Sequence, residues 1–297
     1  MYRQLIPILA PVALCALLGF GWARSKVPFD RAFVTRVVMN IGAPCLILDG
    51  IGRLQADTPA FLLTLMVAVL ALAICASAGY AVLRLGGQPL RSHLPPVVFG
   101  NVGNLGLPLC LFAFGREGLG LALAFFVVGA VAQFIIGPLF QGRDPAWLTL
   151  LRTPIIYAVV AALLILSLKW SLPLWLSNSV ELIGGVSIPL MLLALGHALG
   201  SFQVDRLAAA TRIAVLRLGL GFAAGLALAQ MLGLEGVMRG VVIIESSMPV
   251  AVFNFLLADR YDRHPADVAG AIVVSTLIAF VVLPVLLLFV LPAQVAR

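Results

Sequence analysis

Two long apolar segments of the chain each carry polar side chains next to residues that break helices. The first segment spans residues 93–113 and the second spans residues 236–258. Side chains of these types can bind a small ion or an organic ligand when a broken helix holds them inside a membrane. The candidate site residues are Asn101, Asn104, Gly106 and Pro108 in the first segment, and Glu245, Ser246, Ser247, Pro249 and Asn254 in the second.

Broken helices create binding groups because they free backbone atoms. Proline removes a donor and clashes with the preceding turn, and glycine weakens the helix further. The freed groups cannot face lipid, so they must line a cavity or be met by protein. The N-terminal end of a half-helix can hold a carboxylate, whereas the C-terminal end and its carbonyls can hold a cation. The alternative interpretation is a pair of Pro-kinked helices whose glycines serve packing.

Glu245 lies in the middle of its segment, where an ionised side chain is costly and usually functional. We predict that it couples to an ion, either H⁺ or Na⁺; alternatively it is a structural partner of a nearby amide or hydroxyl. Gln133, Ser275 and Thr276 lie in neighbouring apolar segments and either line the same cavity or bond between helices. No cysteine or histidine has ligand spacing, so we predict no metal site and no cofactor.

The composition places these segments in a membrane protein. The chain has 297 residues, of which 62% are hydrophobic and 10% are charged, and its mean hydropathy is +1.13. Since a soluble domain carries about 25% charged residues, most of this surface must face the lipid bilayer or other helices. We predict an all-α membrane protein of about ten spanning helices. The expected spans are 5–22, 33–51, 59–83, 93–113, 117–140, 153–168, 172–199, 207–232, 236–258 and 267–291.

The net charge of +7 resides mainly in short loops, where basic residues set topology; we therefore expect no nucleic-acid partner. Arginine and lysine are concentrated in the odd-numbered loops, which places those loops in the cytoplasm and both termini outside. The expected location is a bacterial inner membrane, with periplasmic termini. Arg36 and Arg217 fall inside spans near the cytoplasmic ends, and we expect both to snorkel toward that surface.

The two halves of the chain resemble each other. Four prolines of the first half have counterparts at a nearly constant distance along the chain, namely Pro7 and Pro154, Pro44 and Pro189, Pro108 and Pro249, and Pro138 and Pro284. This predicts two five-helix repeats, residues 1–141 and 142–297. Because five is odd, the second copy enters the membrane inverted, as in many secondary transporters.

Four segments resemble the auxin efflux carrier family: NVGNLGLPLCLFAFG, IPLMLLALGHAL, ESSMPVAVFNFLLADRYD and VVSTLIAFVVLPVL. Bacterial members of that family include carriers of malonate and malate. The resemblance implies a fold similar to bile-acid sodium symporters and sodium/proton antiporters. It also implies that the prolines of the two broken helices lie where those helices cross, with Asn101, Asn104, Glu245 and Asn254.

The resemblance further implies a scaffold of spans 1, 2, 6 and 7, often a homodimer surface, and a moving transport domain of spans 3–5 and 8–10. The expected function is secondary transport of a small organic anion such as malonate, malate or an auxin-like carboxylate, by alternating access with an elevator-like motion. The alternative is a cation/proton antiporter or a sodium-coupled symporter of the same fold; no span contains an Asp-Asp pair, which disfavours it. No catalytic motif occurs in the spans, so we expect no enzyme.

Overall fold

The structure, a computed structural model, describes residues 2–25, 27–52, 58–141, 154–168, 170 and 172–291. Within these ranges the chain is helical and forms no strand. Seven stretches are long and apolar enough to cross a membrane. They are Leu5–Arg24, Arg31–Gly50, Pro59–Leu85, Val102–Gln133, Leu174–Ser201, Leu207–Met231 and Pro265–Val290.

The number of spanning helices predicted from the sequence was ten, and the structure does not confirm that number. The predicted spans 93–113 and 236–258 are each interrupted by unwound residues in their middle, and the first of them continues into a helix that reaches Gln141. The predicted span 153–168 corresponds to α8 (Pro154–Ser167), a helix of 14 residues. The described structure therefore establishes an all-helical membrane protein with several spans.

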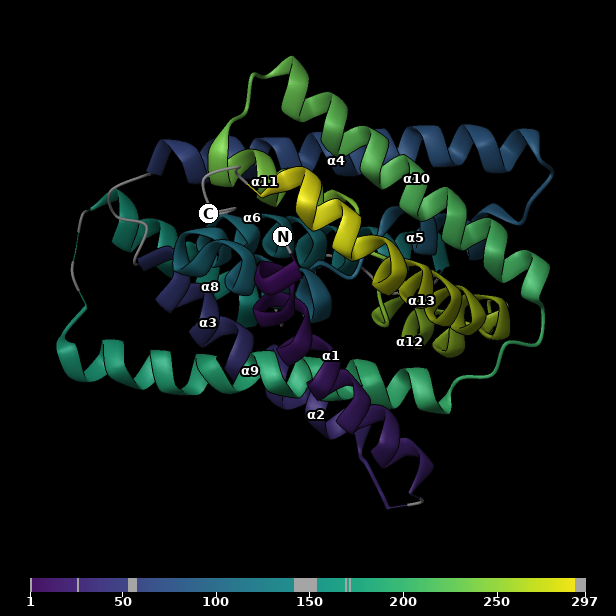
Figure 1. Ribbon diagram of the computed structural model, residues 1–297, viewed down its shortest axis with the longest axis horizontal. Coiled ribbons are helices and arrows are strands. Elements are labelled where there is room, and N and C mark those ends of the chain that lie inside the picture. The colour runs from purple at the N-terminus through teal and green to yellow at the C-terminus, as the bar shows by residue number, and fades with distance from the viewer. Residues whose placement is uncertain are drawn as a thin grey trace.

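One group of helices packs around α9 (Leu174–Ser201). It contains α1 (Tyr2–Arg24), α2 (Arg31–Val37), the π-helical turn η1 (Val38–Gly42) and α3 (Ala43–Gly52), with α8 packed on α3. Small residues allow α1 and α9 to approach closely: a Cβ atom at Gly196 would overlap the carbonyl of Ala16, and one at Gly19 would overlap the carbonyl of Leu193. Figure 1 shows α9 along one edge of the molecule, with α1 and α2 against it.

A second group of helices lies toward the opposite edge in Figure 1. Here α4 (Thr58–Leu85) and α10 (Leu207–Met231) pack on α5 (Leu90–Val98) and α11 (Gly236–Ser246). The turn η2 (Val102–Gly106) leads into α6 (Leu107–Gln141), and α12 (Phe253–Arg260) packs on α13 (Pro265–Val290). Gly115 interrupts α6 with a φ of 69°, a left-handed conformation that suits glycine.

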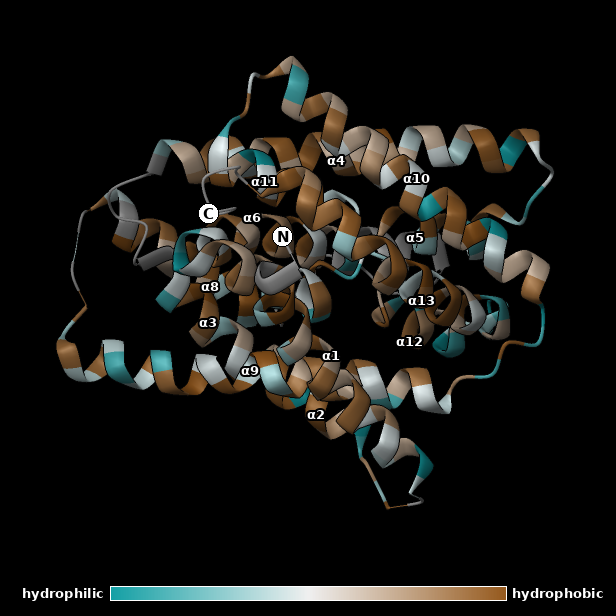
Figure 2. Cartoon of the chain, in the orientation of Figure 1, coloured by the Kyte–Doolittle hydropathy of each residue, from teal (hydrophilic) through white to brown (hydrophobic). Residues whose placement is uncertain are grey.

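The outer faces of the helices are apolar. Figure 2 shows hydrophobic residues along most helices and hydrophilic residues gathered toward helix ends and connections. Leu182 on α9 is 74% exposed and Val281 on α13 is 77% exposed. Large apolar side chains that are exposed to this extent on several helices indicate contact with lipid or with another protein, in agreement with the composition.

Candidate functional site

The two broken segments meet at their breaks. The chain unwinds after α5 and again after α11, and Gly100 forms an antiparallel bridge with Val250. The backbone N–H of Asn101 donates to the carbonyl of Pro249 at 2.7 Å, and the N–H of Ala251 donates to the carbonyl of Phe99 at 3.1 Å. Backbone groups that would be unsatisfied in lipid thus pair with one another. We call these unwound residues, 99–101 and 247–252, the crossing.

The two prolines predicted to mark the crossing are placed differently. Pro249 belongs to the crossing, but Pro108 is in the first turn of α6, beyond η2. Because η2 runs directly into α6, Pro108 lies inside the continuous helix that begins at Val102. The first break lies at Gly100 and Asn101, so the residues that pair with the second break precede Pro108 in the chain.

Arg217 is buried against the crossing, although the sequence predicted that it would snorkel to the membrane surface. Its side chain on α10 is buried, with 3% of the residue exposed. The guanidinium group donates hydrogen bonds to four backbone carbonyls, those of Val97, Val98, Ser246 and Met248. Since these carbonyls belong to both broken segments, one side chain of α10 ties the two breaks together.

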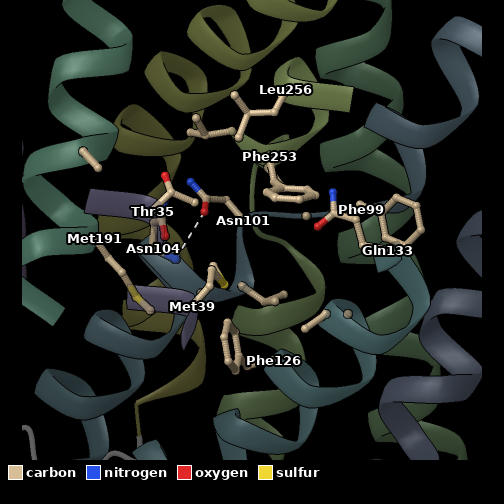
Figure 3. Close-up of a pocket in the computed structure, with 18 of the residues that line it drawn as sticks. Thr35, Met39, Phe99, Asn101, Asn104, Phe126, Gln133, Met191, Phe253 and Leu256 are labelled. Atoms are coloured by element: carbon tan, nitrogen blue, oxygen red, sulfur yellow. Dashed lines mark hydrogen bonds between the residues drawn. The ribbon is translucent and has the colours of Figure 1, made fainter. Parts of the chain in front are cut away.

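A cavity of about 740 Å³ lies beside the crossing and extends to the first group of helices. Apolar side chains form much of its wall, among them Met39, Phe126, Met191 and Leu256. Figure 3 shows Asn101 among the labelled side chains, with Phe253 and Gln133 to one side and Thr35 and Met191 to the other. The cavity is large enough for a small organic molecule.

Three amide side chains predicted from the sequence line this cavity: Asn101, Asn104 and Gln133. The side-chain oxygen of Asn101 accepts the backbone N–H of Asn104 at 3.3 Å and so begins the helical turn η2. The Nδ2 of Asn101 has no hydrogen-bond partner among the described residues, and Asn101 is 3% exposed. A buried donor without a partner is costly, so this atom is suited to bind a ligand that enters the cavity.

Glu245 also lines the cavity, at the end of α11, and is fully buried. One carboxylate oxygen accepts a weak hydrogen bond from the thiol of Cys110 at 3.5 Å, and the other has no partner in the described structure. Gly106 lies against this carboxylate, and a Cβ atom there would overlap it. Gly106 and Glu245, predicted separately from the two segments, are therefore in contact.

The remaining polar residues predicted for the site lie partly in the cavity wall and partly outside it. Among the described residues that line the cavity, Ser246 is present but Ser247, Asn254, Ser275 and Thr276 are not. The hydroxyl of Ser247 donates to the carbonyl of Ile243 at 2.6 Å, and that of Ser275 accepts the N–H of Val250 at 3.1 Å. Thr276 is buried, and its hydroxyl has no partner in the described structure.

Asn254 connects the crossing to the cavity wall. Its Nδ2 donates to the carbonyl of Phe99 at 3.1 Å, and its Oδ1 accepts from Nε2 of Gln133, also at 3.1 Å. The amide of Gln133 is thus held in place by a residue of the opposite broken segment. Asn254 positions a cavity residue, a role that its place in the sequence did not distinguish from direct binding.

No group of three or more His, Cys, Asp or Glu side chains that could hold a metal ion occurs in the part of the chain that the structure describes. The polar groups of the cavity include three amides, together with six charged residues, namely the acids Asp30, Glu245 and Asp259 and the arginines Arg31, Arg36 and Arg217. These groups can hydrogen-bond a polar or anionic ligand of modest size.

Comparison with known proteins agrees with this description. A family model described as membrane transport protein matches residues 142–287. An uncharacterized transporter of Methanocaldococcus jannaschii is 25% identical over 234 residues, covering 75% of this chain and 74% of that protein. An uncharacterized transporter of Methanothermobacter thermautotrophicus is 24% identical over 268 residues, covering 86% and 87%.

A plant protein is also similar. The auxin efflux carrier component 3a of rice (Oryza sativa subsp. japonica) is 27% identical over 151 residues, which cover 48% of this chain and 24% of the rice protein. The resemblance identified from the sequence segments is thereby confirmed. Over residues 142–287 the chain is therefore similar to the membrane transport protein family, and its relatives include two uncharacterized transporters and an auxin efflux carrier component.

Proposed function

We propose that this membrane transport protein is a secondary carrier of a small organic anion, a mono- or dicarboxylate such as malonate, malate or an auxin-like acid. The observation that carries the proposal is the unpartnered amide of Asn101, which is buried at the crossing and lines a cavity of about 740 Å³. An amide N–H donor in such a place is suited to a carboxylate oxygen.

The helix ends beside Asn101 also favour a negatively charged ligand. Val102 begins η2, which continues into α6, and Phe253 begins α12; both residues line the cavity. N-terminal helix ends carry partial positive charge and favour anions. The C-terminal ends of α5 and α11, which would favour a cation, contact the guanidinium group of Arg217 instead.

Glu245 is the proposed coupling residue. Its carboxylate is fully buried, has one oxygen without a partner in the described structure, and lines the same cavity as Asn101. A carboxyl group in such a place can take up and release a proton as the cavity opens to either side. The liposome experiment below distinguishes coupling to H⁺ from coupling to Na⁺ and from transport driven by the membrane potential alone.

We further propose ten spanning helices in two inverted repeats, with alternating access by an elevator-like motion in a bacterial inner membrane and with periplasmic termini. The packing supports this proposal, because α9 contacts α1 and α3, and α3 contacts α8, while α4, α5, α10 and α11 form another group. Under the proposal, the first group is the scaffold and also the homodimer surface. The second group, with α6, α12 and α13, carries the substrate.

The competing proposal is cation/proton exchange or sodium-coupled symport on the same architecture. The buried carboxylate of Glu245 favours it, since a carboxylate can bind a cation directly. One observation opposes it: the fixed positive charge of Arg217 lies at the crossing.

Reconstitution into liposomes tests the proposal. Labelled malonate, malate, other short carboxylates and indole acetate would be screened under imposed pH, sodium and voltage gradients, with empty liposomes as the control. Saturable uptake of at least one carboxylate is expected. If no carboxylate moves under any gradient while Na⁺ or H⁺ does, the anion proposal fails and the cation proposal replaces it.

A further inference from the structure

Arg217 places a buried positive charge at the crossing, and the proposed roles of Asn101 and Glu245 do not involve it. Its contacts in the described part of the chain are carbonyl oxygens and the thiol of Cys75, with no carboxylate ion pair. A buried cation without a counter-ion is costly unless other groups compensate its charge. The compensation here must come from the backbone.

The carbonyls that Arg217 contacts are those that lose their partners when a helix breaks. Val97 and Val98 end α5, at 3.2 and 2.9 Å from the guanidinium NH1. Ser246 ends α11, at 2.7 Å from NH2, and Met248 lies just beyond, at 3.0 Å from Nε. The last carbonyls of a helix have no partner within the helix and carry partial negative charge. Two such ends therefore converge on one guanidinium group.

The guanidinium group of Arg217 can approach these carbonyls closely because two neighbouring residues are glycines. A Cβ atom at Gly100 would lie 2.6 Å from NH2 of Arg217, and one at Gly221, one turn along α10, would overlap the carbonyl of Ser246. Both glycines thus clear space for the guanidinium group and for the carbonyls that receive it. The converging carbonyls therefore resemble a cation-binding site that the guanidinium group of Arg217 occupies.

Carbonyls of unwound helices are the groups that coordinate coupling cations in many secondary carriers. Arginine keeps its proton at every physiological pH, so its charge cannot leave the crossing. We propose that Arg217 is a fixed cation that occupies the carbonyl site of both breaks, and that the crossing therefore binds no free Na⁺. The proposal concerns the ion dependence of the crossing and does not depend on which anion is transported.

Removal of the guanidinium group should convert the occupied site into an open cation site. The experiment compares thermal unfolding of the purified full-length wild type, Arg217→Met and Arg212→Met in sodium, guanidinium or choline chloride at equal, millimolar concentration. Arg212 lies on the same helix but is exposed, so its variant is the matched control. In choline, the Tm of Arg217→Met should fall by about 5–10 °C, since several buried carbonyls lose their partner.

The result that distinguishes the proposal from a purely structural role is a Tm of Arg217→Met that depends on the cation present. Guanidinium should restore a large part of the Tm of Arg217→Met, and sodium should restore less, whereas neither should change the Tm of the wild type or of Arg212→Met. A purely structural role predicts a lower Tm without rescue. The proposal is overturned if sodium raises the Tm of the wild type as much as that of the variant, or if Arg217→Met shows no cation dependence.

If Arg217→Met does not fold, the variant Arg217→Lys tests the proposal instead. Lysine keeps the positive charge on a compact ammonium group with three donors. The proposal predicts a folded protein whose Tm lies below that of the wild type and does not respond to sodium. Failure of Arg217→Lys to fold would contradict it, because a positive charge would then not be what the crossing requires.

Discussion

The backbone N–H of Asn101 donates a 2.7 Å hydrogen bond to the carbonyl of Pro249, so the break in one helix is closed by the break in another. The hydrogen bond joins residues from opposite halves of the chain and places the side chain of Asn101 at the wall of the cavity. This hydrogen bond satisfies backbone groups that unwinding would otherwise leave without partners in the membrane. It also positions the amide that is the candidate ligand-binding group.

Glu245→Gln should separate transport from its dependence on the pH gradient. Glutamine keeps the size of the side chain but cannot carry a transferable proton. If Glu245 couples transport to protons, an imposed pH gradient will accelerate carboxylate uptake in wild-type liposomes and will have no effect on Glu245→Gln. An unchanged response to the gradient in the variant would remove Glu245 from the coupling mechanism.

Gly106→Ala should disturb the contact between the two broken segments. The added Cβ atom would overlap the Glu245 carboxylate, so the backbone or the carboxylate must move. Overpacking of this kind costs roughly 1–3 kcal/mol. We expect a lower Tm and slower uptake. Gly219→Ala, at a position where a Cβ atom meets no other atom within 4 Å, is the control and should lose neither.

Much of the helical framework could be predicted from the sequence, because long apolar segments and helix-breaking residues are local signals. The breaks at Gly100–Asn101 and Ser246–Pro249 are of this kind. The role of Arg217 could not be predicted in this way. An arginine inside an apolar span is compatible with snorkelling, and only the packing of α10 against both breaks brings its guanidinium group to their carbonyls.

The candidate site was predictable as a set of segments but not as a set of contacts. Gln133 and Ser275 are both single polar residues within apolar segments of the sequence. Gln133 lines the cavity, whereas the hydroxyl of Ser275 accepts the N–H of Val250. Which side of a helix faces the cavity depends on rotation about its axis, and nearly uniform apolar surroundings leave that rotation undefined. Pro108 likewise lies inside the continuous helix formed by η2 and α6, and its place in the sequence did not distinguish that position from the break itself.

Gly196→Ala should weaken the packing of α1 on α9. A Cβ atom at Gly196 would overlap the carbonyl of Ala16, and interfaces between membrane helices depend on small residues at such points. We expect a loss of about 1–3 kcal/mol in stability, measured as a lower Tm of the purified protein. Gly185→Ala on the same helix meets no atom within 4 Å and should leave the Tm unchanged, which makes it the matched control.

The buried pair of His93 and Asp267 should link the start of α5 to that of α13. Nε2 of His93 lies 3.3 Å from Oδ2 of Asp267, and both residues are nearly inaccessible. A double-mutant cycle with His93→Ala and Asp267→Asn should give a coupling of about 0.5–3 kcal/mol in stability. Additive effects of the two substitutions would mean that the observed contact does not stabilise the fold.

The central claim is that an organic anion binds at the crossing through the free amide of Asn101. Its most direct test is counterflow of a labelled carboxylate, one that the liposome screen identifies as a substrate, in wild type, Asn101→Ala and the control Ser247→Ala. A hydrogen bond to a charged group contributes about 1.5–3 kcal/mol, so the apparent affinity of Asn101→Ala should fall by roughly 10- to 100-fold. Ser247→Ala should retain the wild-type affinity, because the Ser247 hydroxyl donates to the carbonyl of Ile243 in the last turn of α11 and does not line the cavity. Unchanged affinity in a folded Asn101→Ala would contradict the account.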